Sequence, residues 1–258
     1  MVFTTSEITA YVGTLLWPLF RVAGLIMTAP VFAAKTVPVR VRLGLSIAIT
    51  VMILPIMPAA PSVELFSPSA FFLVAQQLLI GVLMGFTLQI VLATIVTGGQ
   101  VVAMQMGLGF AAMVDPQNGA QTPVLSQFYV IMVVLIYLSM NGHLVLIEVL
   151  VDSFKTMPVS MGGLVPENFY KVVHWAAILF SGAVGIAIPA IASLLIVNFT
   201  FGIMTRAAPQ MNIFAIGFPL TMLLGYGVVF VTLPSVVPRS SNLFTGAYHL
   251  LKNIVGGA

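Results

Sequence analysis

The chain contains no cysteine, and charged residues make up only 6% of its 258 positions. The first absence excludes a disulfide framework and a thiolate metal site. The second excludes an ordinary soluble surface, because a soluble domain carries about 25% charged residues. The net charge of +3 rests on nine basic and six acidic residues, which are too sparse and scattered for a nucleic-acid-binding patch. The surroundings of this chain are therefore expected to be lipid or other apolar protein.

Long hydrophobic segments take the place of charge, with 60% hydrophobic residues and a mean hydropathy of +1.15. A membrane-spanning helix needs about 20 mostly apolar residues, and six segments qualify. They are 9–34, 43–60, 70–98, 124–147, 172–204 and 211–237. The sequence thus predicts an all-α integral membrane protein with long, kinked helices. Prolines inside or near the ends of these segments are the expected kink positions, namely Pro18, Pro55, Pro189, Pro219 and Pro234.

The six segments leave connections that are expected to lie outside regular helices. These are Lys35–Arg42, Ala59–Ser69, Gly99–Pro123, Glu148–Lys171, Thr205–Gln210 and the tail from Pro238. The positive-inside rule places the first of them in the cytoplasm. Strict alternation then puts Arg239 and Lys252 outside, against the rule, which indicates that the helices are not ordinary membrane spans. Glu7 stands where a signal peptide would have a basic residue, so the first apolar segment is expected to be retained.

Arg21 is a charged residue between two apolar half-segments. An intramembrane arginine costs at least ~2.5 kcal/mol unless it reaches the interface or finds a partner. Two interpretations stay open. The side chain faces a polar pore or pairs across a subunit interface, or the first helix begins lower and Arg21 lies at the membrane surface. Arg21 is therefore a candidate buried or interface charge.

Small and uncharged polar residues predict how the helices pack. Glycines one turn apart allow close helix approach. The glycines so identified are Gly81 with Gly85, and Gly182 with Gly185. Gln76, Thr87 and Thr94 return near the same face of one helix. This stripe of uncharged polar residues could line a water-filled path through the protein, or it could hydrogen-bond to neighbouring helices.

No catalytic constellation is present, so an enzyme is not expected. Glu148 and Asp152 share a helix face with Lys155 close behind, the usual pattern of a solvated helix end. A small-molecule secondary transporter would need ionisable residues at mid-depth and repeated halves. Only Arg21 and Asp115 qualify, and no internal repeat is evident. Composition leaves a channel subunit and such a transporter as near equals.

The stretch QMGLGFAAMVDPQNGAQ, residues 105–121, gathers turn-forming residues around the carboxylate Asp115. No Asp, Glu, Lys or Arg occurs in 65–114 or in 116–147. Asn118-Gly119 is a strong turn signal. A chain that turns at membrane depth must be buried in protein or line water. The stretch is therefore either an ordinary polar loop or a re-entrant segment inside an assembly.

Two sequence stretches resemble the FliR family, flagellar biosynthetic membrane proteins with counterparts in type III secretion injectisomes. They are GGQVVAMQMGLGFAAMVDPQNG (98–119) and MTRAAPQMNIFAIGFPL (204–220). RVAGLIMTAPVF (21–32) followed by VPVRVRLGLSIAIT (37–50) looks like the N-terminal pattern of the same family. The paired VDPQ and APQMN motifs at this separation are specific, and the resemblance spans essentially the whole chain.

The resemblance implies a core subunit of the flagellar type III secretion export gate in the bacterial inner membrane. Its partners would be FliP, FliQ and FlhB, its cargo unfolded flagellar proteins, and it would need no cofactor. Residues 1–170 would form a FliP-like part and 171–258 a FliQ-like helical hairpin. These subunits would wind into a helical hetero-oligomeric cone, partly raised toward the periplasm.

The resemblance also implies roles for individual residues. Residues 105–121 correspond to the family's plug loop, which projects into the pore and helps to close it. The plug or seal residues would be Met106, Gly107, Gly109, Phe110 and Met113, and the loop's base would be Asp115, Pro116 and Gln117. The hairpin tip, 205–212, would lie at the cytoplasmic entrance near FlhB. Its contact residues would be Arg206, Gln210 and Asn212.

Overall fold

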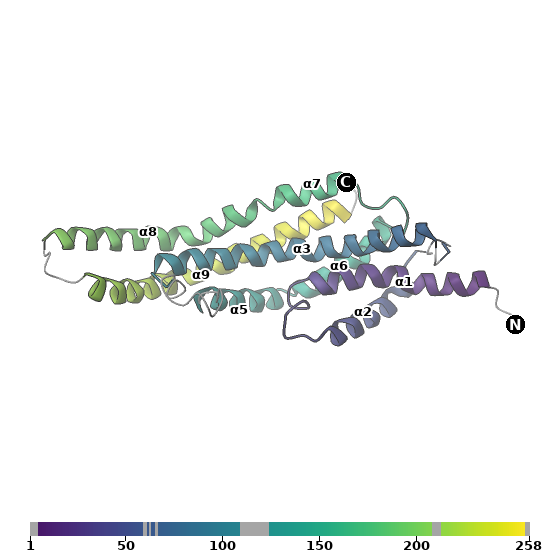
Figure 1. Cartoon of the computed structure of the whole chain (residues 1–258), viewed down its shortest axis with the longest axis horizontal. Helices are drawn as coiled ribbons and strands as arrows, with labels where there is room; N and C mark the ends of the chain where they lie inside the picture. Colours follow the sequence, from purple (N-terminus) through teal and green to yellow (C-terminus); the bar gives the residue numbers. More distant parts are fainter. Residues whose placement is uncertain are drawn as a thin grey trace. The chain divides into compact units, whose positions relative to one another are not determined.

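The computed structural model describes residues 5–58, 61, 63–64, 67–108, 124–207 and 213–255, with side chains described from residue 12 onward except at 213–216 and 218. Within these ranges all regular secondary structure is helical (Figure 1). The helices are α1 (Thr5–Thr28), α2 (Val39–Ile53), the short 3-10 helix η1 (Leu54–Ile56), α3 (Pro68–Gln105), α5 (Val124–Ser139), α6 (Gly142–Thr156), α7 (Pro166–Trp175), α8 (Ile178–Ala207) and α9 (Ile213–Val255). The prediction of an all-α membrane protein is confirmed.

Helix boundaries differ from the sequence prediction in several places, for example in α5, α6 and α9. The segment 124–147 breaks at Asn141, whose left-handed backbone (φ 56°) separates α5 from α6 by a bend of 62°. The connection expected from Glu148 is helical as far as Thr156. The tail expected from Pro238 continues α9 to Val255. Prolines are tolerated inside apolar helices because neighbouring groups can satisfy the carbonyls they leave free.

The chain folds into two compact units that alternate along the sequence. Unit 1 comprises Met1–Ile90, Met140–Ala176 and Phe244–Ala258, and unit 2 comprises Val91–Ser139 and Ala177–Leu243. The division falls inside α3 and inside α9, so each of these helices contributes to both units. The units are described separately below.

Close contact between α1 and the first half of α3 forms the centre of unit 1. A Cβ atom on Gly81 would lie 2.0 Å from the Arg21 carbonyl oxygen, and one on Gly24 would lie 2.6 Å from that of Leu78. A Cβ on Gly85 would meet the Thr28 hydroxyl at 2.1 Å. The side-chain amide of Gln89 donates to the Thr28 carbonyl at 3.0 Å, where α1 ends. The predicted packing role of Gly81 and Gly85 is confirmed, because only residues without a side chain allow these backbones to approach so closely.

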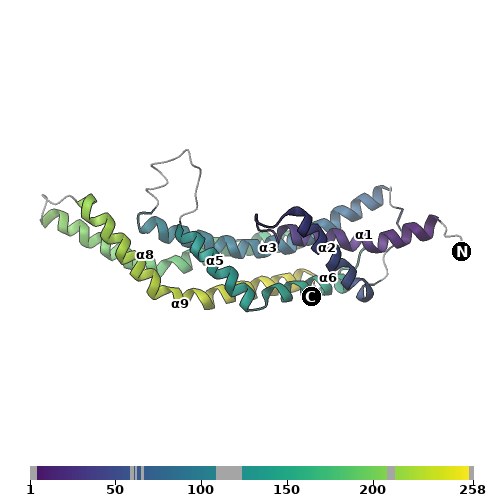
Figure 2. The same cartoon turned by 90° about the horizontal axis from the view of Figure 1, so that it is seen from below.

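Unit 2 repeats this mode of packing around the second half of α3. A Cβ on Gly98 would lie 3.2 Å from the Ala183 carbonyl of α8, and one on Gly99 would lie 3.2 Å from Ser126 of α5. Gly182 of α8 packs in turn against Thr94. α5, α8 and α9 therefore gather around α3 within this unit, with α8 and α9 running as a hairpin (Figure 2).

Pro189 breaks the hydrogen-bond ladder of α8, and a side chain of α9 repairs it. Proline has no backbone N–H, so the Gly185 carbonyl one turn earlier loses its donor within the helix. The guanidinium of Arg239 donates a hydrogen bond to that carbonyl. Gly185 leaves room for it, since a Cβ there would lie 3.3 Å from the Arg239 nitrogen. Sequence reasoning identified Pro189 as a kink and Gly185 as a packing residue, but missed the arginine that joins them.

This arrangement predicts a specific double-mutant cycle. Arg239→Leu alone should lower the free energy of unfolding by about 1 kcal/mol, because it leaves a carbonyl unpaired. Pro189→Ala restores a backbone donor, so Arg239→Leu should cost almost nothing in that background. Denaturant titration of the four purified variants measures the coupling. Arg206→Leu, in the exposed last turn of α8, is the matched control, and equal costs in both backgrounds would contradict the pairing.

Among the residues that the structure describes, four helical stretches are long and apolar enough to cross a membrane: Val39–Ile56, Pro68–Gln105, Pro166–Ala207 and Pro219–Val255. The bent pair α5–α6 would be a fifth if it counts as one span. The most apolar part of Pro68–Gln105 is 61% buried by the chain itself, whereas the corresponding parts of the other three are only 22–28% buried. α3 is therefore the helix the others cover, and the other stretches leave apolar side chains for lipid or protein neighbours.

Candidate functional site

The stretch 105–121 begins at a well-defined helix end. The Leu108 N–H donates to the Ala103 carbonyl and the Gly107 N–H to that of Met104, both at 3.0 Å. This is the Schellman pattern that closes a helix, and it requires a left-handed residue at the position of Gly107, whose φ is 84°. Gly107 thus terminates α3, because a residue without a side chain adopts this left-handed conformation at no steric cost.

Met106 lies inside unit 2. Its side chain is fully buried, and a Cβ on Gly225 of α9 would lie 2.6 Å from it. The structure therefore places Met106 at the anchored end of the stretch and not on a projecting surface. The other plug and base candidates lie outside the described residues: Gly109, Phe110, Met113, Asp115, Pro116 and Gln117.

The turn between α8 and α9 is described only up to Ala207. Arg206 is exposed in the last turn of α8. There its positive charge is favourable, because the C-terminal end of a helix carries partial negative charge. Gln210 and Asn212 lie outside the described residues. The structure therefore positions one of the three entrance candidates, as an accessible cation at a helix end.

Arg21 is enclosed within unit 1, with none of its surface exposed. Its Nε donates to Gln77 Oε1 at 2.8 Å, and one terminal nitrogen donates to the Ser153 carbonyl and hydroxyl at 2.8 and 3.0 Å. The other terminal nitrogen donates to the Met157 carbonyl at 2.8 Å. The guanidinium carbon lies 4.2 Å from the centre of the Phe154 ring, a cation–π distance. One side chain of α1 thus joins α3 to the end of α6.

The counter-charge for Arg21 is a helix end and not a carboxylate. Across the described part of the chain, no Asp or Glu lies within ion-pair distance of its guanidinium. Ser153 lies in the last turn of α6 and Met157 is its C-cap residue, where unpaired carbonyls carry partial negative charge. Of the two possibilities in the expectation of a buried or interface charge, the structure shows a buried one, because the three nitrogens of Arg21 all bind within this chain. Its partners, distant in sequence, were not predicted.

The polar stripe of α3 also faces neighbouring protein within the chain. Gln76, Thr87 and Thr94 are all buried. With its amide oriented to satisfy both atoms, Gln76 donates to the Ser160 carbonyl at 2.7 Å and accepts from the Gly163 N–H at 2.6 Å. The Thr87 hydroxyl donates to a carbonyl of its own helix at 2.9 Å. Of the two interpretations, packing against neighbouring segments is the one observed for Gln76.

Chemistry-bearing side chains are sparse in the described ranges. No group of three or more His, Cys, Asp or Glu residues there is arranged to hold a metal ion. Asp152 and Lys155 form an ion pair of 3.1 Å in the last turns of α6, with about half of each side chain exposed. This confirms the prediction of a solvated helix end. What the structure offers is a set of anchored loops and tightly packed apolar helices, which suits a membrane assembly.

A comparison with known protein families matches nearly the whole of this chain. The family described as bacterial export proteins, family 1, matches residues 12–247. The chain belongs to this family of bacterial export proteins. The match runs from within α1 to within α9, and so includes parts of both units and the sequence stretches 105–121 and 205–212.

Individual relatives of this export-protein family agree along nearly the whole length. The flagellar biosynthetic protein FliR of Escherichia coli (strain K12) is 38% identical over 252 residues, which cover 98% of this chain and 96% of that protein. The protein of the same name from Pectobacterium carotovorum subsp. carotovorum is 34% identical over 255 residues, covering 99% and 97%. That of Bacillus subtilis (strain 168) is 27% identical over 238 residues, covering 91% and 92%. The resemblance inferred from the two motifs is therefore confirmed.

Proposed function

We propose that this chain is the FliR subunit of a bacterial flagellar export gate, a non-enzymatic membrane protein that helps to form and seal the channel for unfolded flagellar proteins. The observation that carries the proposal is the end-to-end similarity to proteins named for flagellar biosynthesis, at up to 38% identity with 98% of this chain aligned. The family to which the chain belongs is one of bacterial export proteins.

The proposed assembly is a hetero-oligomeric cone with FliP and FliQ, with FlhB nearby at the cytoplasmic side. Residues 1–170 would occupy a FliP-like position and 171–258 a FliQ-like one. The length of α3 supports an assembly that extends beyond the lipid. Its 38 residues span about 57 Å at ~1.5 Å per residue, against a hydrocarbon core of about 30 Å. The apolar side chains left uncovered on α8 and α9 would meet partner subunits, with part of the complex raised toward the periplasm.

The seal of the closed channel is assigned to the stretch that follows Gly107. Since Met106 is buried against α9, it serves as the anchor. Phe110 and Met113 are the proposed apolar seal, with Gly109 beside them and Asp115, Pro116 and Gln117 at the returning base. The proposed entrance contacts for FlhB are Arg206, Gln210 and Asn212, of which Arg206 is accessible at the end of α8.

Co-purification tests the proposed function directly. We expect the chain, expressed with the neighbouring membrane genes, to purify as one copy bound to several copies of small hydrophobic partners. Native mass spectrometry measures the subunit masses in the complex. A lone monomer or homodimer that binds a small solute would overturn the export-gate proposal and favour a transporter.

Deleting residues 107–112 tests the plug assignment. The assembled mutant gate should leak ions, because the apolar side chain of Phe110 is lost from the proposed seal. Planar-bilayer conductance of the purified complex is the measurement, with native mass spectrometry to verify intact assembly. Gly44→Ala, on the open side of α2, should leave conductance unchanged. A fully assembled deletion mutant without a leak would remove the sealing role.

A further inference from the structure

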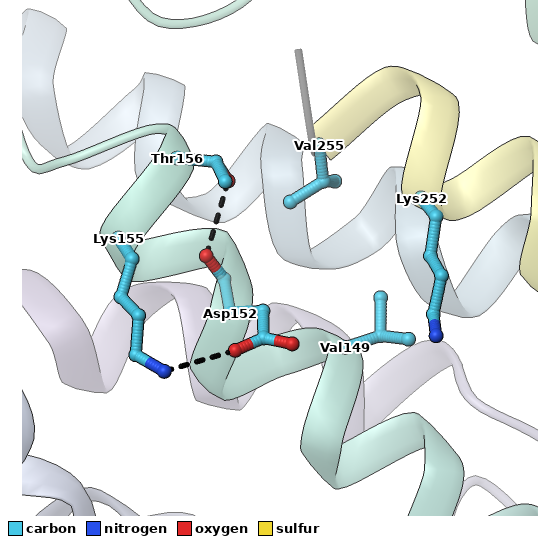
Figure 3. Close-up of a pocket in the computed structure, with 6 residues that line it drawn as sticks. All are labelled: Val149, Asp152, Lys155, Thr156, Lys252 and Val255. Atoms are coloured by element: carbon cyan, nitrogen blue, oxygen red, sulfur yellow. Dashed lines mark hydrogen bonds and ion pairs between the residues drawn. The ribbon is translucent and has the colours of Figure 1, made fainter. Parts of the chain in front are cut away.

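A shallow cleft lies in unit 1 where α6 and α9 end side by side (Figure 3). It encloses about 350 Å³ and is lined by Val149, Asp152, Lys155, Thr156, Lys252 and Val255. We propose that this cleft binds the phosphate of an anionic phospholipid headgroup. Neither the export function nor the family assignment requires such a site.

The two helices are held in register, so the cleft is preformed. The Tyr248 hydroxyl of α9 donates to the Gly142 carbonyl at the start of α6, at 2.7 Å. From that contact both helices run in the same direction, and their last turns bring Lys155 and Lys252 to one place. Figure 3 shows the Asp152 carboxylate between the two lysines.

The charge balance of the cleft favours an anion. Lys252 is exposed and makes no hydrogen bond or ion pair with the described residues. Among the described residues Lys155 pairs only with Asp152, and an ion pair with both side chains about half exposed contributes little, so a phosphate can recruit the ammonium. Two helix C-termini add roughly one negative charge in total, but the guanidinium of Arg21 already binds the carbonyls that end α6. The cleft itself is lined by two ammonium groups and one carboxylate, and the partial negative charge at the end of α6 is already offset by Arg21.

A lipid is the source of phosphate that this position favours. Val149 and Val255 give the cleft an apolar wall beside its ammonium groups. The cleft lies at the C-terminal end of a stretch of α9 that is apolar enough to span a membrane, Pro219–Val255. Lysines at the ends of such helices reach the headgroup level with their long side chains. A phosphate tethered to acyl chains satisfies the ammonium groups and the apolar wall together, which a free phosphate ion cannot.

Lysine labelling with peptide mass spectrometry tests the proposal on the full chain in neutral detergent, with any partners that co-purify. Short-chain phosphatidylglycerol should protect Lys155 and Lys252 from an amine-reactive reagent, while Lys171, exposed on α7, stays reactive. Lys252→Gln should weaken that protection at Lys155 about fivefold, the effect of losing about 1 kcal/mol. Lys171→Gln should leave the affinity unchanged.

Three outcomes would overturn the proposal. Equal protection of Lys171 would mean that the lipid only coats the protein, and equal protection by inorganic phosphate would mean that acyl chains play no part. In the third, Lys252→Gln lowers the unfolding temperature while the affinity for phosphatidylglycerol stays at the parent value. The lysine would then act only by stabilising the end of its helix.

Discussion

Replacing Arg21 by methionine should lower the free energy of unfolding by about 3 kcal/mol or more. Methionine fills much of the same space, but it leaves four acceptors without their donor: Gln77 Oε1, the Ser153 carbonyl and hydroxyl, and the Met157 carbonyl. It also removes the cation from the end of α6. Because one side chain joins α1, α3 and α6, the loss should loosen unit 1 as a whole. Thermal unfolding in detergent, followed by size-exclusion chromatography, is the measurement.

Two further variants separate the hydrogen bonds of Arg21 from its packing. Arg21→Lys keeps the charge but offers a single ammonium group, which cannot reach all of these acceptors, so its stability should fall between the parent and Arg21→Met. Replacing Gln77 by Leu and Ser153 by Ala in the Arg21→Met background should recover part of the loss, since two orphaned acceptors are then gone. Arg40→Met, at an exposed arginine of α2, should have almost no effect. An Arg21→Met protein as stable as Arg40→Met would show that the hydrogen bonds of Arg21 do not stabilise unit 1.

Gly81→Ala is expected to be the most disruptive single-methyl insertion in unit 1, at about 3 kcal/mol. The new Cβ would lie 2.0 Å from the Arg21 carbonyl oxygen and 2.8 Å from the Leu25 nitrogen. Both are backbone atoms, so no change of rotamer can relieve the clash and the two helices must separate. That movement would also pull Arg21 away from Gln77. Arg21→Met and Gly81→Ala therefore both weaken the contact between α1 and α3, the first from α1 and the second from α3.

Gly44→Ala is the matched control for Gly81→Ala. Gly44 is also a helical glycine of unit 1, but a Cβ there meets no atom within 4 Å. Alanine is the better helix former by about 0.5–1 kcal/mol, so this variant should be neutral or slightly more stable. Gly85→Ala should be intermediate, because the Thr28 hydroxyl that its Cβ meets first can rotate and the nearest backbone atom, the Ala29 nitrogen, lies at 2.7 Å rather than 2.0 Å. Equal unfolding temperatures for Gly81→Ala and Gly44→Ala would show that α1 and α3 are not held at this distance.

Local sequence patterns predicted the parts of this fold that depend on local chemistry. Hydropathy indicated membrane helices, and the one-turn spacing of Gly81 and Gly85 indicated a close helix crossing, because both signals lie within a few residues of one another. The break between α5 and α6 also had a local signal, Asn141-Gly142, since Asn followed by Gly is a strong turn dipeptide. That signal went unused because the surrounding segment is apolar enough for a continuous span.

Long-range partners could not be predicted from the same patterns. Arg21 binds residues 56, 132 and 136 positions away, and no spacing rule covers such separations. The pairing of Arg239 with Gly185 has the same character. Burial of a charge signals that partners must exist, but which atoms supply them depends on how the helices pack. Helix ends were missed for a related reason, because prolines predict breaks in isolated helices, whereas α9 continues through Pro234 and Pro238.

The way Arg21 is bound affects which pairs of positions are expected to change together in related sequences. Two of its acceptors, the carbonyls of Ser153 and Met157, belong to the backbone. A backbone carbonyl is present whatever side chain the position carries, so Met157 is free to change without losing its contact. We therefore expect that searches for correlated substitutions would find little trace of the link between α1 and the end of α6. Gln77, whose own side chain accepts the hydrogen bond, is the position where compensating change with Arg21 should be visible.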